Sequence, residues 1–151
     1  THLLYFLIFL HCLILVTGGN YTYSKVPLGF WLQDLFHFTR NHYDRIGHFA
    51  QGFVPAIIAR EILLRGKFVN GGKMLAFIVV CICLAVSAAY ELIEWLAAVM
   101  LGQGADAFLG TQGDNWDTQW DMFMALCGAA AALITLSRLH DGQIAKLKSR
   151  V

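Results

Sequence analysis

The sequence predicts an all-α protein, a polytopic bundle of transmembrane helices, and three observations support this fold class. Hydrophobic residues make up 58% of the chain and charged residues only 14%, against about 25% charged residues in a soluble domain. Long uncharged runs recur along the chain and are separated by polar or glycine-rich segments. The length of 151 residues suits one compact unit. We therefore expect a single transmembrane domain over 1–151, with about four spanning helices and a short interfacial helix.

The charge and the cysteines exclude several other classes of protein. The net charge is only +1, and no basic stripe with interleaved aromatic residues is present, so no nucleic-acid partner is expected. All four cysteines lie inside apolar runs, which is typical of small buried hydrophobic residues rather than of a disulfide framework or a zinc site. The expected partner is the lipid bilayer, and an oligomer or a partner subunit remains open.

The first spanning helix is expected over 2–17. Its apolar run, from Leu3 to Val16, is shorter than the roughly 20 residues of a typical span. Because the chain also begins without a methionine, we expect further residues before it. The segment Thr17-Gly18-Gly19-Asn20 is predicted to end this helix.

An interfacial helix is expected over 27–38. Pro27 opens this segment, and aromatic and polar residues then alternate along it. It is too short to cross a bilayer, and its pattern is typical of a helix that lies at the membrane surface.

The second spanning helix, expected over 41–64, is the least hydrophobic of the set. Asp44, His48 and Gln51 recur at i, i+4 and i+7, so they share one helix face. Pro55 predicts a kink just beyond this face.

The third spanning helix, expected over 74–101, carries two carboxylates in an apolar setting. Ser87, Glu91 and Glu94 fall on one face. An ionisable side chain in a spanning helix is costly, so it normally faces protein or water and marks a functional site.

The fourth spanning helix is expected over 117–138. Asp117 at its start can be explained as an N-cap, but Asp121 lies one turn further inside and cannot. Gly128 and the four alanines after it predict a surface for close helix packing. The tail over 139–151 is basic.

The distribution of basic residues predicts the orientation of the chain. The loop between the second and third helices and the tail over 139–151 are rich in Lys and Arg and are expected in the cytoplasm. The loop over 102–116 has no Lys or Arg and is expected outside. All three polar faces then lie at the outer end of the bundle.

The polar faces together predict a site for a divalent metal ion. Carboxylates with one imidazole suit Zn²⁺, Mn²⁺ or Mg²⁺, and the metal would also activate water. Within this site Glu91, Asp117 and His48 are the expected catalytic residues, for hydrolysis or group transfer on a lipid or envelope substrate at the outer face. The candidate metal ligands are Asp44, His48, Glu91, Glu94, Asp117 and Asp121.

Two other functions explain the same polar residues. They could form a proton or ion relay in a small transporter, or a satisfied hydrogen-bond network that fixes the packing of a partner subunit. No serine-protease-like set, phosphate-binding loop or haem motif is visible in the sequence. Whether the protein is an enzyme stays open at this point.

Three segments, 41–53, 90–95 and 113–122, resemble the signature segments of the YjdF-type bacterial inner-membrane proteins. The resemblance extends from about Phe30 to Arg138. It implies a multi-pass protein of the bacterial inner membrane, in a family whose members have a further N-terminal span, and it implies no reaction. The layout of acidic residues near one surface is also similar to VanZ-like membrane proteins, which is an analogy only.

Overall fold

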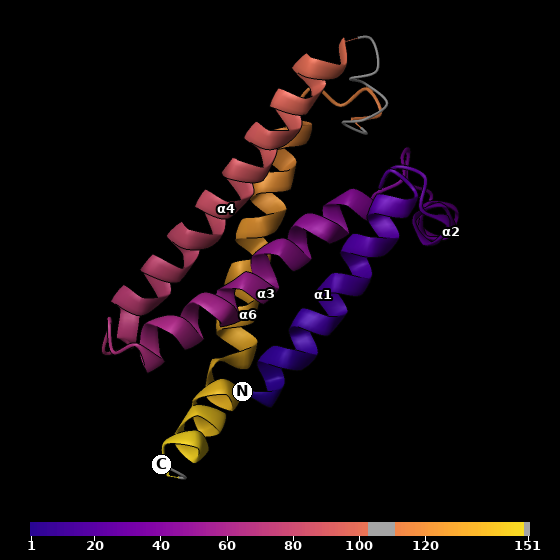
Figure 1. Cartoon of the computed structure of the whole chain (residues 1–151). Coiled ribbons are helices and arrows are strands. Elements are labelled where there is room, and N and C mark those ends of the chain that lie inside the picture. The colour runs from indigo at the N-terminus through magenta and orange to yellow at the C-terminus, as the bar shows by residue number, and fades with distance from the viewer. Residues whose placement is uncertain (103–110, 150–151) are drawn as a thin grey trace.

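The computed structural model describes residues 1–102 and 111–149, and the regular elements in this part of the chain are all α-helices. This confirms the all-α bundle. The expected outer loop over 102–116 falls partly on 103–110, which lie outside the described residues. The helices are α1 His2–Asn20, α2 Pro27–Phe36, α3 Tyr43–Arg65, α4 Gly72–Leu101 and α6 Asp117–Lys148 (Figure 1).

Three of the described helices, α1, α4 and α6, are long and apolar enough to span a membrane. The expectation of about four spans is therefore corrected to three. The helix α3, expected as a span over 41–64, is too polar for lipid contact, and its residues Asp44, Arg60 and Glu61 are buried within the protein. It lies between α1 and the α4/α6 pair (Figure 1) and packs against all three helices. Its neighbours thus shield its polar groups from lipid.

Two helices, α1 and α6, end more than two residues beyond their expected bounds. α1 continues through the glycines to Asn20, and it ends where the backbone N–H groups of Tyr21 and Tyr23 donate to the Gly18 carbonyl (3.1 and 2.7 Å). α6 continues past residue 138 to Lys148, so most of the basic tail belongs to this helix. The extension is held by buried His140, whose Nε2 lies 3.1 Å from Glu61 Oε2 on α3.

The helix α2 is joined tightly to the start of α3. Pro27 occupies its first turn, where a missing backbone N–H costs nothing. Asn41 Nδ2 donates to the Val26 carbonyl (3.0 Å), while Asn41 Oδ1 accepts from the Tyr43 backbone N–H (3.0 Å). A Cβ at Gly29 would overlap the Asn41 side chain. This junction fixes where α3 begins.

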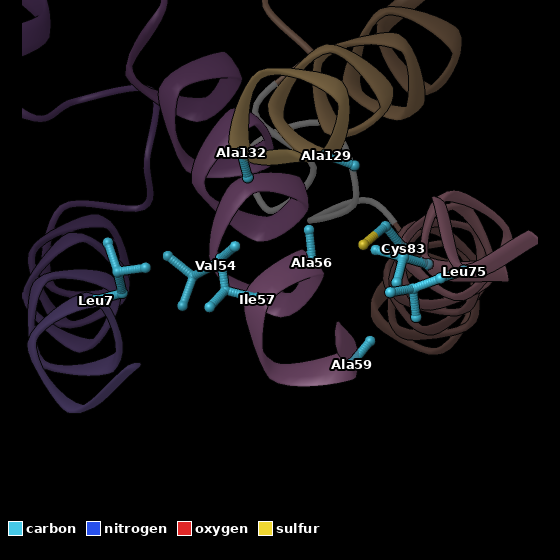
Figure 2. Close-up of a cluster of buried hydrophobic side chains, with 10 residues drawn as sticks. Leu7, Val54, Ala56, Ile57, Ala59, Leu75, Cys83, Ala129 and Ala132 are labelled. Carbon is cyan, nitrogen blue, oxygen red and sulfur yellow. The ribbon is translucent and has the colours of Figure 1, made fainter. Parts of the chain in front are cut away.

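The apolar core surrounds α3. Figure 2 shows Val54, Ala56 and Ile57 of α3 between Leu7 of α1 and the side chains of α4 and α6. Burial of this cluster provides the packing that holds the four long helices together. The remaining buried members of the cluster are Ala59, Leu75, Val79, Cys83, Ala129 and Ala132.

The helices α3 and α6 cross at very short range because each carries a glycine at the contact. A Cβ at Gly52 would overlap the Ala125 carbonyl oxygen, and a Cβ at Gly128 would overlap the Phe49 carbonyl oxygen. On the opposite side of Gly52, the Cys83 thiol of α4 donates to the Gly52 carbonyl (3.5 Å). The small-residue packing surface expected at Gly128 is thereby confirmed.

Adding a methyl group at this crossing is expected to destabilise the protein. Gly52→Ala and Gly128→Ala each force two backbones apart, and overpacking of this kind costs about 1–3 kcal/mol. Gly142→Ala is the matched control on α6, since nothing lies near a Cβ there and alanine favours a helix over glycine by up to about 1 kcal/mol. Thermal unfolding in nanodiscs measures the difference. Equal unfolding temperatures for Gly128→Ala and Gly142→Ala would contradict the close crossing.

The orientation expected from the basic residues is tested by cysteine labelling. Lys67 lies in the loop between α3 and α4, and Asn115 is exposed just before α6. In intact cells a membrane-impermeant thiol reagent should label Asn115→Cys and spare Lys67→Cys, each compared with the parent protein. The reverse labelling pattern would place the outer end of the bundle in the cytoplasm.

Candidate metal centre

Three helices bring four ionisable side chains together at the end of the bundle opposite the chain termini (Figure 1). Asp44 and His48 come from the first two turns of α3, Glu91 from the C-terminal half of α4, and Asp121 from the second turn of α6. We call these four residues the cluster. Their side chains are buried, and the most exposed of them, Asp44, is only 12% exposed.

The imidazole of His48 lies at the middle of the cluster. Its Nε2 is 3.7 Å from Asp44 Oδ1, 3.7 Å from Glu91 Oε1 and 3.9 Å from Asp121 Oδ2. All three distances exceed the length of a hydrogen bond. The four groups therefore face one point without bonding to each other.

Several polar atoms here have no hydrogen-bond partner within the described part of the chain. They are Glu91 Oε1, Asp121 Oδ1, His48 Nδ1 and the hydroxyl of Ser87, which lies one turn before Glu91 on α4. Ser87 is fully buried and Asp121 is only 3% exposed. Leaving a buried polar atom unpaired costs about 1–3 kcal/mol, and more when it is charged. In residues 1–102 and 111–149, the protein therefore supplies no hydrogen-bond partner for these buried atoms.

A metal ion fits the space that these atoms face. Ligands about 2.0–2.2 Å from a Zn²⁺, Mg²⁺ or Mn²⁺ ion lie roughly 3–3.6 Å from one another. One ligand atom each from Asp44, His48 and Asp121 lies within 4.8 Å of the others, and the distances to His48 Nε2 are only slightly longer than a coordinated set requires. The three ligand atoms would have to move closer together to coordinate one ion, because 4.8 Å exceeds the separation in a coordinated set.

Ion pairs lie next to the cluster, and they involve Asp114, just before α6, and Asp117, in its first turn. Arg40 NH1 donates to Asp117 Oδ1 (2.7 Å) and lies 3.4 Å from Asp114 Oδ2, while Arg45 NH2 donates to Asp114 Oδ2 (2.6 Å). Arg45 also lies over the ring of Trp120, 5.4 Å from its centroid. Asp117 is thus paired with an arginine beside the cluster.

The pKa of Asp114 is lowered by this environment. The main cause is the Trp116 backbone N–H, which donates to Asp114 Oδ1 (2.9 Å), and the positive charges of Arg45 and Arg40 add to it. Since the pKa is lower in the folded protein, these contacts stabilise the fold at neutral pH and are lost as the pH falls through that lowered value.

The deeper acids outnumber the positive charges near them. Two arginines offset Asp114 and Asp117, so Asp44, Glu91, Glu94 and Asp121 share one imidazole. Two like charges about 5 Å apart repel by roughly 3 kcal/mol at an effective dielectric constant of about 20. The acids can all be ionised only if a cation lies among them.

Glu94 lies beside the cluster, one turn closer to the outer end of α4. Together with Glu91, Asp117 and Asp121 it lines a polar cavity of about 110 Å³. The hydroxyl-bearing side chains of Thr111 and Thr118 also line this cavity. The cavity could hold a few waters or a small polar group.

The structure thus brings three of the six expected metal ligands, Asp44, His48 and Asp121, within reach of one another. Glu91 lies 3.7 Å from His48 Nε2, and it lines the neighbouring cavity together with Glu94 and Asp117.

Sequence reasoning did not find the contact between Asn41 and Gln112. The Asn41 backbone N–H donates to Gln112 Oε1 (3.1 Å), and Gln112 Nε2 donates to the Asn41 carbonyl (2.9 Å). These residues lie 71 positions apart, so no local spacing pattern in the sequence could have predicted the contact. It joins the segment before α6 to the start of α3.

Comparisons with known proteins agree with the resemblance found in the sequence. Residues 1–142 match the family described as Predicted membrane protein (DUF2238). The chain is 62% identical over 144 residues to Inner membrane protein YjdF of Escherichia coli (strain K12), a match that covers 95% of this chain and 69% of that protein. No solved structure matches the chain.

Arg40 and Asp117 are expected to affect the stability of the protein as a pair, so that the effects of removing each side chain do not add. Both side chains are at most 10% exposed, and removing one partner of a buried pair costs about 3–5 kcal/mol because the other charge remains. Arg40→Gln and Asp117→Asn should each lower the unfolding temperature, and the double variant should recover much of the loss. Additive losses would show that the two side chains do not interact. Lys73→Gln, exposed near the start of α4, is the control.

Proposed function

Since the chain belongs to the DUF2238 family of predicted membrane proteins, we propose that this integral inner-membrane protein binds a divalent metal ion at the cluster. Asp44, His48, Glu91 and Asp121 are the proposed ligands. The single observation that carries the proposal is that His48 Nε2 lies 3.7–3.9 Å from three carboxylate oxygens and is hydrogen-bonded to none of them.

The composition of the cluster favours a hard or borderline cation. Three carboxylates and one imidazole suit Zn²⁺, Mn²⁺ or Mg²⁺, whereas the described thiols lie elsewhere: Cys83, for example, donates to the backbone of α3. Binding would satisfy the unpaired oxygens of Glu91 and Asp121 and offset the repulsion among the acids. One ion therefore removes both unfavourable features of the site.

The proposed activity is hydrolysis or group transfer on a lipid or envelope substrate at the outer face. A bound ion would activate water and stabilise charge on an ester or phosphate oxygen. Glu91 and Glu94 line the polar cavity, so either carboxylate can accept a proton from a water held there. Asp117, aligned by Arg40, would orient the polar part of the substrate.

Metal analysis of the purified protein tests this proposal. The unsubstituted chain, purified without chelator, should contain about one divalent ion per chain, and Asp121→Asn or Glu91→Gln should reduce this to background because each removes a ligand. Asp34→Asn is the matched control, since Asp34 is an exposed acid on α2. Added ion should raise the unfolding temperature of the variants that still bind it and leave that of the others unchanged. At 100 times its Kd, a bound ion adds about 2.7 kcal/mol to the free energy of unfolding.

Absence of metal from the unsubstituted protein, together with a stable Glu91→Gln variant, would contradict the metal site. The same acids would then have to be neutralised by protons. A proton relay and a purely structural polar network would remain as the functions to distinguish.

A further inference from the structure

A second cavity lies beside the cluster, between α1, α3 and α4. Its volume is about 190 Å³ and its wall is almost entirely apolar, with Leu15 from α1, Pro55 from α3 and Val86 from α4. Asp44 and His48 also line it. The polar cavity is lined instead by Glu91 and Asp121. The cluster therefore separates an apolar cavity from a polar one.

The helices on either side of the apolar cavity face lipid. α1 and α4 are both candidate membrane spans, and large apolar side chains such as Leu13, Val16 and Leu92 are exposed on them. The molecules next to these surfaces are membrane lipids. A hydrocarbon chain can thus enter the cavity from the bilayer without crossing water.

One polar atom in the cavity wall points to the kind of chain that fits. His11 of α1 lines the cavity, and its buried Nε2 has no hydrogen-bond partner among residues 1–102 and 111–149. A buried nitrogen of this kind needs a partner. The ester carbonyl at the head of an acyl chain can accept a hydrogen bond from it, whereas a polyprenyl chain offers no such oxygen.

We propose that the apolar cavity binds the acyl chain of a glycerophospholipid whose phosphate headgroup lies at the cluster. This assignment rests on the proposed function, because it names the substrate class of the same site. A volume of about 190 Å³ encloses about six methylene-sized groups at roughly 30 Å³ each. Only the ester and the first carbons are therefore enclosed, and the rest of the chain continues between α1 and α4 into the bilayer.

Photocrosslinking of the full chain in nanodiscs tests the proposal. The probe is phosphatidylglycerol with a diazirine on an acyl carbon near the ester. Adducts are expected on the segments of α1 and α4 around Leu15 and Val86. Val86→Trp and Leu15→Trp each fill the cavity from a different helix and should lower the adduct yield about tenfold. Val99→Trp, on an exposed part of α4, should leave the yield unchanged.

Two outcomes would overturn the proposal. One is an equal yield in Val86→Trp, Leu15→Trp and Val99→Trp, and the other is labelling by a diazirine-bearing polyprenyl phosphate in place of the phospholipid. Metal content measured on the same samples separates this inference from the proposed function. Adducts confined to the cavity in a metal-free protein would support the lipid site while overturning the metal site.

Discussion

The backbones of α3 and α6 approach closely because Gly52 on α3 and Gly128 on α6 carry no side chain at the contact, and this close crossing determines where the cluster lies. Gly52 is one turn beyond His48 on α3, and it contacts Ala125, one turn beyond Asp121 on α6. Four residues rise about 6 Å along a helix. The crossing therefore fixes both the separation and the register of the helices at the level of the site.

The same crossing explains how a polar helix can occupy the middle of a membrane protein. α3 is too polar to be counted among the spans, yet Asp44, Arg60 and Glu61 are all buried. Arg60 and Glu61 find partners at the far end of the bundle, where Arg60 NH2 lies 2.7 Å from Asp141 Oδ1 and Glu61 Oε2 lies 3.1 Å from His140 Nε2. Polar groups at that end are satisfied by protein.

The cluster differs from this satisfied end in the same molecule. Glu91 Oε1 and Asp121 Oδ1 lack partners in the described residues, although the two arginines near them are engaged with Asp114 and Asp117. The described residues thus satisfy the buried polar groups at one end of the bundle and leave several without a partner at the other. In our proposal, a cation together with the polar group of a lipid would satisfy them.

Much of this arrangement could be predicted from the sequence, for identifiable physical reasons. The spacing of Asp44 with His48 on α3 fixes their common helix face, and the glycine and alanines from Gly128 indicate a packing surface, because both features are local. The burial of α3 could not be predicted, since it depends on which helices surround it. The ion pair between Asp117 and Arg40 could not be predicted from the sequence either, because the two residues are 77 positions apart.

The measurement that addresses the cluster most directly is pulsed electron paramagnetic resonance of Mn²⁺ bound to the purified full chain. This technique detects nitrogen nuclei bound directly to the ion. The proposed metal site predicts the signal of one directly bound imidazole nitrogen, lost in His48→Asn and kept in His2→Asn, since His2 is exposed at the other end of the bundle. A spectrum with no bound nitrogen, or one that survives His48→Asn, would contradict a metal ion held among α3, α4 and α6.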